Sequence, residues 1–244
     1  MADSLDILYR DDSFVAINKP AGLLVHRSEI DRRETRFAIQ LLRDQIGQRV
    51  FPVHRLDKPT SGVLLFALDR ENHRRLSGDF MANRVAKAYL AVVRGYTAER
   101  GCIDHPLKLV HDPYDGRTLR SDTPPQPAVT AFERLATVEL PYRVDRYPSS
   151  RYSLVRLRPE TGRKHQLRRH MKHIAHPIIG DTSYGKSRHN RLFQAKFGCQ
   201  RLLLAATELC FCHPVSAESV TIRAPLQGDF AALMETLGWS AIAR

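Results

Sequence analysis

Cysteine is scarce in this 244-residue chain, and it follows no pattern. The four cysteines (Cys102, Cys199, Cys210 and Cys212) include no C-x-x-C pair, so neither a disulfide framework nor a structural zinc site is expected. Long apolar runs are also absent: none exceeds six residues, whereas a membrane-spanning helix needs about 20. The first residues show no basic or apolar segment of a secretory signal. We therefore expect a cytoplasmic protein with reduced cysteines and no membrane span.

Metal-binding motifs are missing, although the chain has 11 histidines. Four histidines lie close together, at His165, His170, His173 and His176, but there is no H-E-x-x-H motif and no neighbouring carboxylate to complete a site. Arginine and lysine side chains interleave these histidines and would repel a divalent cation. We predict that the protein holds no metal.

Positive charge, in contrast, is abundant and local. The chain has 38 Lys and Arg against 26 Asp and Glu, which gives a net charge of +12. Residues 161–207 contain ten of these basic residues and one acid, Asp181, and so carry nine of the net charges. A local excess of this kind favours a polyanionic partner, first of all a nucleic acid. The alternative is a solvated basic face that only keeps the protein in solution.

Apolar patterning predicts many short strands and few helices. Helices are expected over residues 34–46, after residue 68, from near residue 163 and at the C-terminal end around Phe230. The strands often follow one another without an intervening helix, which favours an α+β domain with a mixed, mostly antiparallel sheet and flanking helices. No Gly-rich linker divides the chain, so residues 1–244 are predicted to form one domain. The expected strands cover residues 14–17, 23–26, 63–68, 85–93, 129–135, 152–157, 201–206, 209–212 and 220–222.

The segment V-H-R-L-D-K-P-T-S-G, residues 53–62, places Asp57 on a tight turn just before an apolar strand. Rigid loops at strand ends often present functional side chains. His54, Arg55 and Lys58 are expected to surround Asp57 with positive potential, which would keep the carboxylate ionised. Such a carboxylate can act as nucleophile, general base or electrostatic stabiliser. A loop aspartate that only caps the turn or forms an ion pair is the alternative.

A second segment, T-G-R-K-H-Q-L-R-R-H-M at residues 161–171, predicts a helix whose buried side carries Leu167 and Met171. Arg168 flanks this buried stripe, so it leans inward and needs a carboxylate partner. Asp57 is the natural candidate. Arg169 and Lys172 face outward, where they can meet phosphates or remain ordinary solvated charges.

Five segments together resemble the RluA-type pseudouridine synthase family, which modifies ribosomal and transfer RNA. The first is H-R-L-D followed by T-S-G, residues 54–62. The others are N-K-P-A-G at 18–22, K-A-Y at 87–89, T-G-R-K-H-Q-L-R at 161–168 and H-P-I-I-G-D at 176–181. They occur in the family's order, and the similarity extends over residues 7–225.

The resemblance implies roles for individual residues. Asp57 matches the catalytic aspartate, Tyr89 the tyrosine that stacks on the target base and assists proton transfer, and Arg168 the basic partner of the aspartate. Arg55 matches the arginine thought to fill the space left by a flipped nucleotide. The family fold has a central RNA-binding cleft and uses neither cofactor nor metal. Together with the charge pattern, the resemblance also assigns RNA contacts to His54, Arg163, Lys164, His165, Arg169, Lys172 and Leu204.

Within the family, the chain most resembles a member that acts on uridine 65 of tRNA, through Q-P-A-V-T at 126–130, R-Y-P at 146–148 and R-Y at 151–152. Because the chain begins almost at its first strand, no N-terminal S4-type RNA-binding domain is expected. One departure is Ala205, where a histidine often stands. An enzyme for 23S rRNA and a non-catalytic RNA-binding or chaperone protein remain alternatives. No apolar surface stripe is left over, so we expect a monomer.

Overall fold

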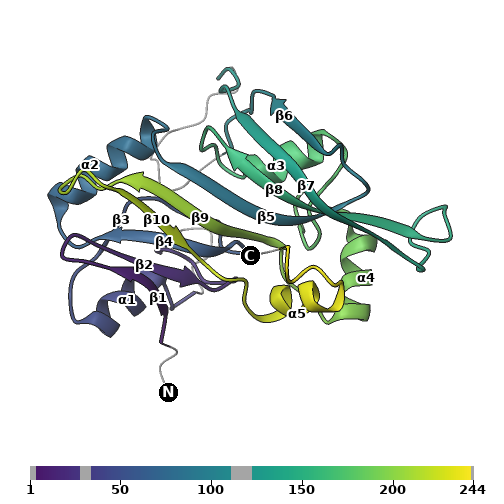
Figure 1. The fold of residues 1–244 in the computed structure, drawn as a ribbon, viewed down its shortest axis with the longest axis horizontal. Helices are drawn as coiled ribbons and strands as arrows, with labels where there is room; N and C mark the ends of the chain where they lie inside the picture. The colour runs from purple at the N-terminus through teal and green to yellow at the C-terminus, as the bar shows by residue number, and fades with distance from the viewer. Residues whose placement is uncertain (1–3, 28–33, 111–122, 243–244) are drawn as a thin grey trace.

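The computed structural model of the chain describes residues 4–27, 34–110 and 123–242 (Figure 1). Within these residues the chain forms ten strands and five helices. The strands are β1 (Asp6–Arg10), β2 (Phe14–Lys19), β3 (Phe51–Pro52), β4 (Ser61–Ala67), β5 (Ala86–Arg94), β6 (Arg100–Asp104), β7 (Val129–Leu140), β8 (Ser150–Pro159), β9 (Leu204–Cys212) and β10 (Ser219–Arg223). The helices are α1 (Ala38–Ile46), α2 (Arg70–Met81), α3 (Gln166–His173), α4 (Ser187–Phe197) and α5 (Gly228–Thr236).

All ten strands belong to one sheet. Its main order is β1-β2-β4-β9-β5-β8-β7-β6, with β3 paired to β4 and β10 paired to β9. Every one of these pairings is antiparallel except β4 with β9, which is parallel. The mixed, mostly antiparallel sheet with flanking helices predicted from the sequence is therefore confirmed.

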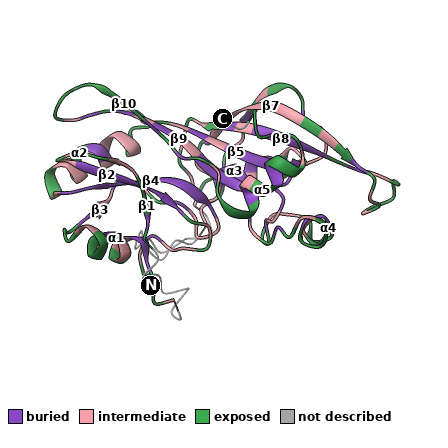
Figure 2. Cartoon of the chain, turned by 60° about the horizontal axis from the view of Figure 1, so that its bottom comes forward, coloured by how far each residue is buried: buried purple, intermediate pink, exposed green. Residues whose placement is uncertain are grey.

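In one half of the molecule, β4 lies between α1, which covers one face of the sheet, and α2, which covers the other. All seven residues of β4 are buried (Figure 2), because successive side chains of a strand point to opposite faces and both faces are covered. Leu64 and Phe66 pack with Leu42 of α1, whereas Val63 and Leu65 pack in another cluster with Leu76 of α2. This double cover explains the continuous apolar run in the sequence.

In the other half, helices cover β5 and β8 in the same way. Leu167 and Met171 of α3 pack with Val93 and Val155, which confirms the predicted buried side of that helix. On the opposite face, Phe193 of α4 and Phe230 of α5 pack with Val92 and Leu154. The sheet thus continues through both halves, with its one parallel pairing near the middle.

Several local expectations were wrong. The strands expected over residues 201–206 and 209–212 are replaced by the single strand β9, Leu204–Cys212, and residues 23–26 make only an isolated bridge between Leu24 and Phe37. The α3 helix begins at Gln166, because His165 adopts a left-handed conformation (φ +56°). The strands β1, β3 and β6 and the helix α4 were not predicted. Residues 111–122 lie outside the described residues.

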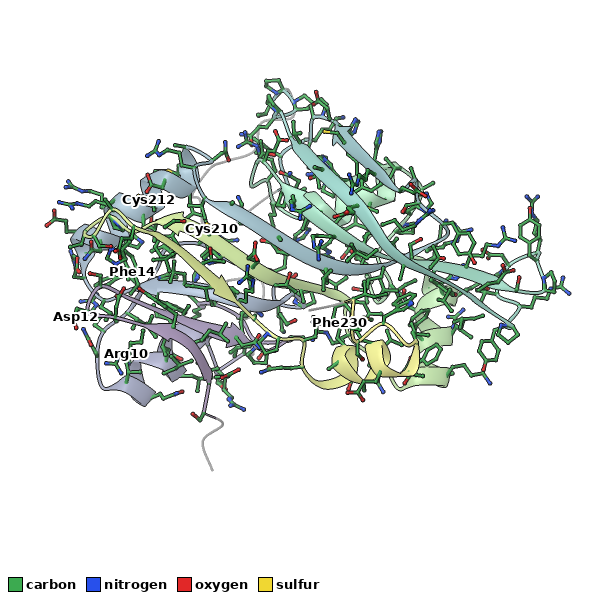
Figure 3. All side chains as sticks on the ribbon, in the orientation of Figure 1. Arg10, Asp12, Phe14, Cys210, Cys212 and Phe230 are labelled. Atoms are coloured by element: carbon green, nitrogen blue, oxygen red, sulfur yellow. The ribbon has the colours of Figure 1, made fainter. Side chains whose placement is uncertain are left out.

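The cysteines are all free. Cys199 is buried, Cys210 is half-buried, and Cys102 and Cys212 are exposed. Cys210 and Cys212 lie on β9, to the left of Phe230 of α5 in this view (Figure 3). No helix in the described ranges is both long and apolar enough to cross a membrane.

Candidate active site

Asp57 lies on the loop that joins β3 to β4, and the end of this loop is fixed by the parallel contact with β9. Ser61 and Gly62 pair with Ala205 and Ala206. A Cβ atom at Gly62 would overlap the backbone of Ala206, and Gly62 has a φ of +110°, so only glycine fits. The turn that carries Asp57 therefore has a fixed position relative to β9. The Asp57 side chain on this turn is 27% exposed.

Lys19 holds the same loop from behind, and its side chain is fully buried. Gly22 adds a hydrogen bond from its N–H to the carbonyl oxygen of Lys58, at 2.8 Å. The N-K-P-A-G segment is thus bonded to the residue that follows Asp57. The Lys19 Nζ donates to the carbonyl oxygens of Pro20, Leu23 and Lys58 at 3.0, 2.8 and 3.2 Å.

Arg168 projects from α3 and contacts two carboxylates. Its Nη1 lies 3.1 Å from Oδ2 of Asp57, which is the partner expected from the sequence. Its Nε and Nη2 donate to Oδ2 and Oδ1 of Asp181, at 2.7 and 2.9 Å. Asp181 also accepts hydrogen bonds from the N–H groups of Ser183 and Tyr184. Sequence reasoning missed Asp181, which fixes the guanidinium from the side opposite Asp57.

The ion pair between Arg168 and Asp181 stabilises the charged forms of both side chains. Burial opposes the charged forms of both side chains, but the hydrogen bonds and opposite charge between them outweigh it. The pKa of Arg168 is accordingly raised, and the pKa of Asp181 is lowered. Arg168 therefore remains a cation beside Asp57 at every pH at which the protein is folded.

Tyr89 lies on β5 and borders the same cavity as Asp57. Burial, and then the nearby negative charge of Asp57, raise the pKa of its phenol, so the hydroxyl stays protonated at neutral pH. Lys87 borders the cavity too, as expected for residues two apart on one strand. Leu204, at the start of β9, contributes an apolar patch to the wall.

His165 is a third group close to Asp57. Its Nε2 lies 3.8 Å from Oδ2 of Asp57, and its Nδ1 lies 3.0 Å from the hydroxyl of Tyr184. Burial lowers the pKa of His165, the charge of Asp57 opposes this effect, and Arg168 adds to it. The imidazole thus lies beside the Asp57 carboxylate. The backbone of His165 has a positive φ, which non-glycine residues seldom adopt.

The turn before α3 depends on the buried side chain of Gln166. Its Oε1 accepts from the Thr161 hydroxyl and from the N–H of Arg163, at 2.7 and 3.0 Å. Its Nε2 donates to the carbonyl of Val129 and to the hydroxyl of Thr130, both at 2.9 Å. Gln166 therefore ties the basic turn to β7, a role that no sequence pattern indicated.

These elements surround an open cavity of about 720 Å³, within the size range of ligand sites. Asp57 is the only acidic residue of its described lining, while basic side chains predominate around it. The cavity therefore suits an anionic ligand large enough to fill it, with one carboxylate at its wall. Its basic lining residues are Arg55, Lys87, Arg163, Lys164 and Arg168.

Comparison with known proteins identifies the family. Residues 13–173 match the model of the RNA pseudouridylate synthase family. The chain belongs to this family. It is therefore an isomerase, and the family resemblance seen in its sequence motifs is confirmed.

Two curated relatives of this pseudouridine synthase are named tRNA pseudouridine synthase C. The protein from Haemophilus ducreyi is 55% identical over 235 residues, covering 96% of each chain. The protein from Haemophilus influenzae is 52% identical, covering 98% of this chain and 100% of its own. Among solved structures, human RNA Pseudouridylate Synthase Domain Containing 4 has a TM-score of 0.71 at 26% identity, covering 96% of this chain and 93% of its own.

His54, one of the residues expected to surround Asp57 with positive charge, does not do so in the pseudouridine synthase, and Lys58 also pairs with another acid. His54 stacks on Phe80 with ring centroids 4.7 Å apart, and its Nε2 accepts from the N–H of Leu65. Burial lowers the pKa of His54 to about 3, so this ring borders the cavity as a neutral group. Lys58 forms an ion pair with Glu34 at 2.7 Å and does not line the cavity.

The two outward-facing residues of α3 differ from each other. Lys172 is exposed, and its Nζ lies 5.7 Å from the centroid of the Tyr184 ring. Arg169 is half-buried and donates to the carbonyl of Lys108 at 2.9 Å. Neither residue lines the cavity, so any RNA that they contact lies at its rim.

Ala205, the departure from the family pattern, has no effect on the cavity. It lies in the core cluster with Leu203 and Phe193, whereas the neighbouring Leu204 lines the cavity. The substitution is thus a packing change on the other face of β9. Within the described ranges, no group of three or more His, Cys, Asp or Glu side chains could hold a metal ion.

Proposed function

We propose that this pseudouridine synthase acts on tRNA at uridine 65 in the cytoplasm, as a monomer, without metal or cofactor, and with Asp57 as its catalytic carboxylate. The tRNA substrate is supported by relatives named tRNA pseudouridine synthase C that match 96–98% of this chain. The observation that carries the catalytic assignment is the Arg168 contact, because it holds one carboxylate at the wall of a basic cavity.

The reaction conserves every atom of the nucleotide. The bond between C1′ and N1 breaks, the base rotates, and C1′ bonds to C5, while C5 loses a proton and N1 gains one. A single carboxylate can begin this sequence by attacking the nucleotide or by removing the C2′ proton. Arg168 and His165 both approach Oδ2 of Asp57. We therefore assign the reaction to Oδ1 of Asp57. This atom could take either first step, attack on the nucleotide or removal of the C2′ proton.

The other cavity residues bind and orient the nucleotide in this proposal. A uridine stacked in a helix is out of reach, so it must flip into the cavity. Tyr89 then stacks on the base as a protonated phenol, which can donate a proton but cannot accept one before deprotonation. Arg55, which is exposed at the mouth of the cavity, occupies the space that the nucleotide leaves. His54, Arg163, Lys164, His165 and Leu204 contact the RNA around the flipped uridine.

Pseudouridine mapping tests the reaction and its position together. Unmodified tRNA and 23S rRNA are incubated with the wild type, with Asp57→Asn and with Asp12→Asn. Asp12 is an exposed acid near the β1–β2 turn (Figure 3) and serves as the matched control. We expect modification of tRNA at position 65 by the wild type and by Asp12→Asn. Asp57→Asn should form no pseudouridine and bind tRNA within a few-fold of the wild type.

Other outcomes would reject parts of the proposal. Modification of 23S rRNA alone would replace the substrate and leave the role of Asp57 intact. Full activity of Asp57→Asn would remove the catalytic assignment. A wild type that binds both RNAs and modifies neither would favour the non-catalytic alternative.

A further inference from the structure

A second basic surface lies outside the cavity, where α4 packs beside the hairpin that joins β7 to β8. We call it the α4–hairpin surface. The two views agree that this hairpin extends beyond the rest of the molecule and that α4 lies next to its base (Figures 1 and 2). None of its residues lines the cavity. Its members, all exposed, are Arg143, Arg146 and Tyr147 of the hairpin and Arg188, Arg191 and Lys196 of α4.

Acidic residues are scarce in the two segments that carry this surface. Residues 182–207 contain no Asp or Glu, and residues 141–149 contain only Asp145. Asp145 is exposed, and its Oδ2 lies 3.1 Å from Nη2 of Arg94 and 3.1 Å from Nε2 of His189. It also interacts electrostatically with Arg188, so it offsets only part of the charge of this surface. Clustered cations of this kind, displayed by two separate elements, attract a polyanion.

Buried contacts hold the two elements in one arrangement. The Tyr152 hydroxyl on β8 lies 2.8 Å from Nδ1 of His189 on α4. Burial lowers the pKa of His189, and the neutral ring fits both contacts, because Nε2 donates to Asp145 while Nδ1 accepts from Tyr152. The hairpin is thus fixed against α4, and binding to this surface need not order a flexible loop.

The exposed groups suit a nucleic acid strand in detail. Arg188 and Arg191 are three residues apart, on the side of α4 away from the buried Phe193. At the hairpin tip, Tyr147 is 58% exposed, and the guanidinium of Arg146 lies 4.6 Å from the centroid of its ring. Cations bind phosphates, and an aromatic ring beside an arginine offers a stacking platform for a base.

This surface also continues from the candidate active site. Tyr184 contacts Arg168, which lines the cavity, and the exposed Lys172, with their charged groups 5.1 and 5.7 Å from its ring centroid. Lys186, the N-cap residue of α4, follows only two residues later. A strand that leaves the cavity over Tyr184 therefore meets α4 next.

We propose that the α4–hairpin surface binds the sugar–phosphate backbone of the substrate RNA at a segment remote from the flipped uridine. The inference rests on the proposed function, because it takes RNA as the substrate. It adds a second site that would make recognition depend on the folded shape of a large RNA, beyond the stem that carries the target.

Two substrates and two matched variants test this inference. The substrates are a full-length unmodified tRNA and a short hairpin that contains only the arm with the target uridine. Arg188→Gln/Arg191→Gln removes two charges from the surface. Arg10→Gln/Arg49→Gln removes two exposed charges elsewhere, and Arg10 lies on β1, far from α4 (Figures 1 and 3). The Kd of each RNA is measured across a salt series, together with kcat and KM.

For full-length tRNA, we expect the surface variant to weaken binding about tenfold or more and to lower the slope of log K against log salt by about 2. The short hairpin should bind and react as with the wild type, and the control variant should match the wild type on both RNAs. If the surface variant bound full-length tRNA with the wild-type Kd and the wild-type salt slope, the inference would be overturned. Equal losses on both RNAs would overturn it too, because the charges would then act on the cavity itself.

The result is separable from the proposed function. If the wild type modifies neither RNA, the proposed function fails, whatever the binding data show. If it modifies both and the surface variant changes neither Kd, only the α4–hairpin surface is rejected.

Discussion

The guanidinium of Arg168 and the carboxylate of Asp181 form a buried two-point ion pair, with Nε 2.7 Å from Oδ2 and Nη2 2.9 Å from Oδ1. Two parallel hydrogen bonds fix both the position and the plane of a guanidinium. Only Nη1 is then directed at Asp57, at 3.1 Å. Asp181 therefore acts through Arg168 and determines from which side the proposed catalytic carboxylate is held.

Replacing this acid should separate positioning from chemistry. In Asp181→Asn, the guanidinium of Arg168 stays buried but no longer has the Asp181 carboxylate as its counter-charge. The free energy of unfolding should therefore fall by about 3–5 kcal/mol. Arg168 would also lose its fixed plane, and kcat should fall about 10–100-fold with little change in KM. Urea unfolding and single-turnover pseudouridine formation measure the two effects.

Asp57→Asn should give the contrasting result, because we propose that Asp57 itself reacts. Its side chain is partly exposed and makes one contact with Arg168, so stability should change little while isomerisation is lost. An Asp181→Asn protein with wild-type kcat would show that Arg168 needs no second carboxylate.

These two partners of Arg168 show what the sequence could and could not predict. The inward lean of Arg168 follows from its place beside Leu167 and Met171 on one helix, which is a local relationship. Asp181 lies 13 residues further on, beyond the end of α3 and a Pro/Gly turn, where helical periodicity says nothing about contacts. Its segment, H-P-I-I-G-D, was part of the family resemblance but carried no assigned role.

Other failures have equally physical causes. His54 was read as positive because its sequence neighbours are basic, but its charge depends on burial against Phe80, which is distant in sequence. The α4 helix escaped prediction because only His189 and Phe193 of its 11 residues are buried, too few to produce an apolar stripe. The strand order could not be predicted either, because β9 is inserted between β4 and β5.

Salt dependence should distinguish Lys172 from Arg169. Lys172 is exposed, and its charge is available to a phosphate, whereas Arg169 already donates to the carbonyl of Lys108. Lys172→Gln should therefore weaken tRNA binding and lower the salt slope by about 0.7–0.9, as for one lost phosphate contact. Arg169→Gln should lower the slope less.

Titration of tRNA with each variant between low and moderate salt makes this measurement. Arg10→Gln, an exposed arginine on β1, is the control and should keep the wild-type slope. An unchanged slope in the double variant Arg169→Gln/Lys172→Gln would mean that the RNA does not cross the outer face of α3.

Lys19 predicts a pH dependence of stability. Burial, and then repulsion from Arg201, lower its pKa to about 7 in the folded protein, against about 10.4 in an unfolded chain. Between these values the unfolded state binds more protons than the folded state, so this lysine makes the free energy of unfolding rise with pH. Its contribution should approach about 1.4 kcal/mol per pH unit above pH 7.

Urea unfolding at pH 6, 8 and 9 would measure this contribution. The slope of the free energy of unfolding against pH should differ between the wild type and a variant without Lys19. Lys19→Met should be less stable throughout, because the carbonyls of Pro20, Leu23 and Lys58 lose their shared donor, and it should lack the rise above pH 7. Lys186→Met, which removes an exposed lysine, should follow the wild-type slope. Parallel curves for the wild type and Lys19→Met would contradict the assignment.

Gly62 and Gly78 offer a matched pair of glycine-to-alanine substitutions with opposite expected signs. Gly62 lies where β4 meets β9, with a positive φ and no room for a Cβ beside Ala206. Gly78 lies inside α2, where a Cβ would meet nothing within 4 Å. Gly78→Ala should therefore stabilise the protein by about 0.5–1 kcal/mol through helix propensity.

Gly62→Ala should destabilise the protein by about 3 kcal/mol, since backbone strain and overlap add. Because Gly62 ends the loop that carries Asp57, the same change should reduce kcat even at a temperature where the variant is fully folded. Thermal unfolding and single-turnover kinetics test the two statements separately. A folded Gly62→Ala protein with wild-type kcat would show that the parallel contact between β4 and β9 fixes the strand without fixing the loop that carries Asp57.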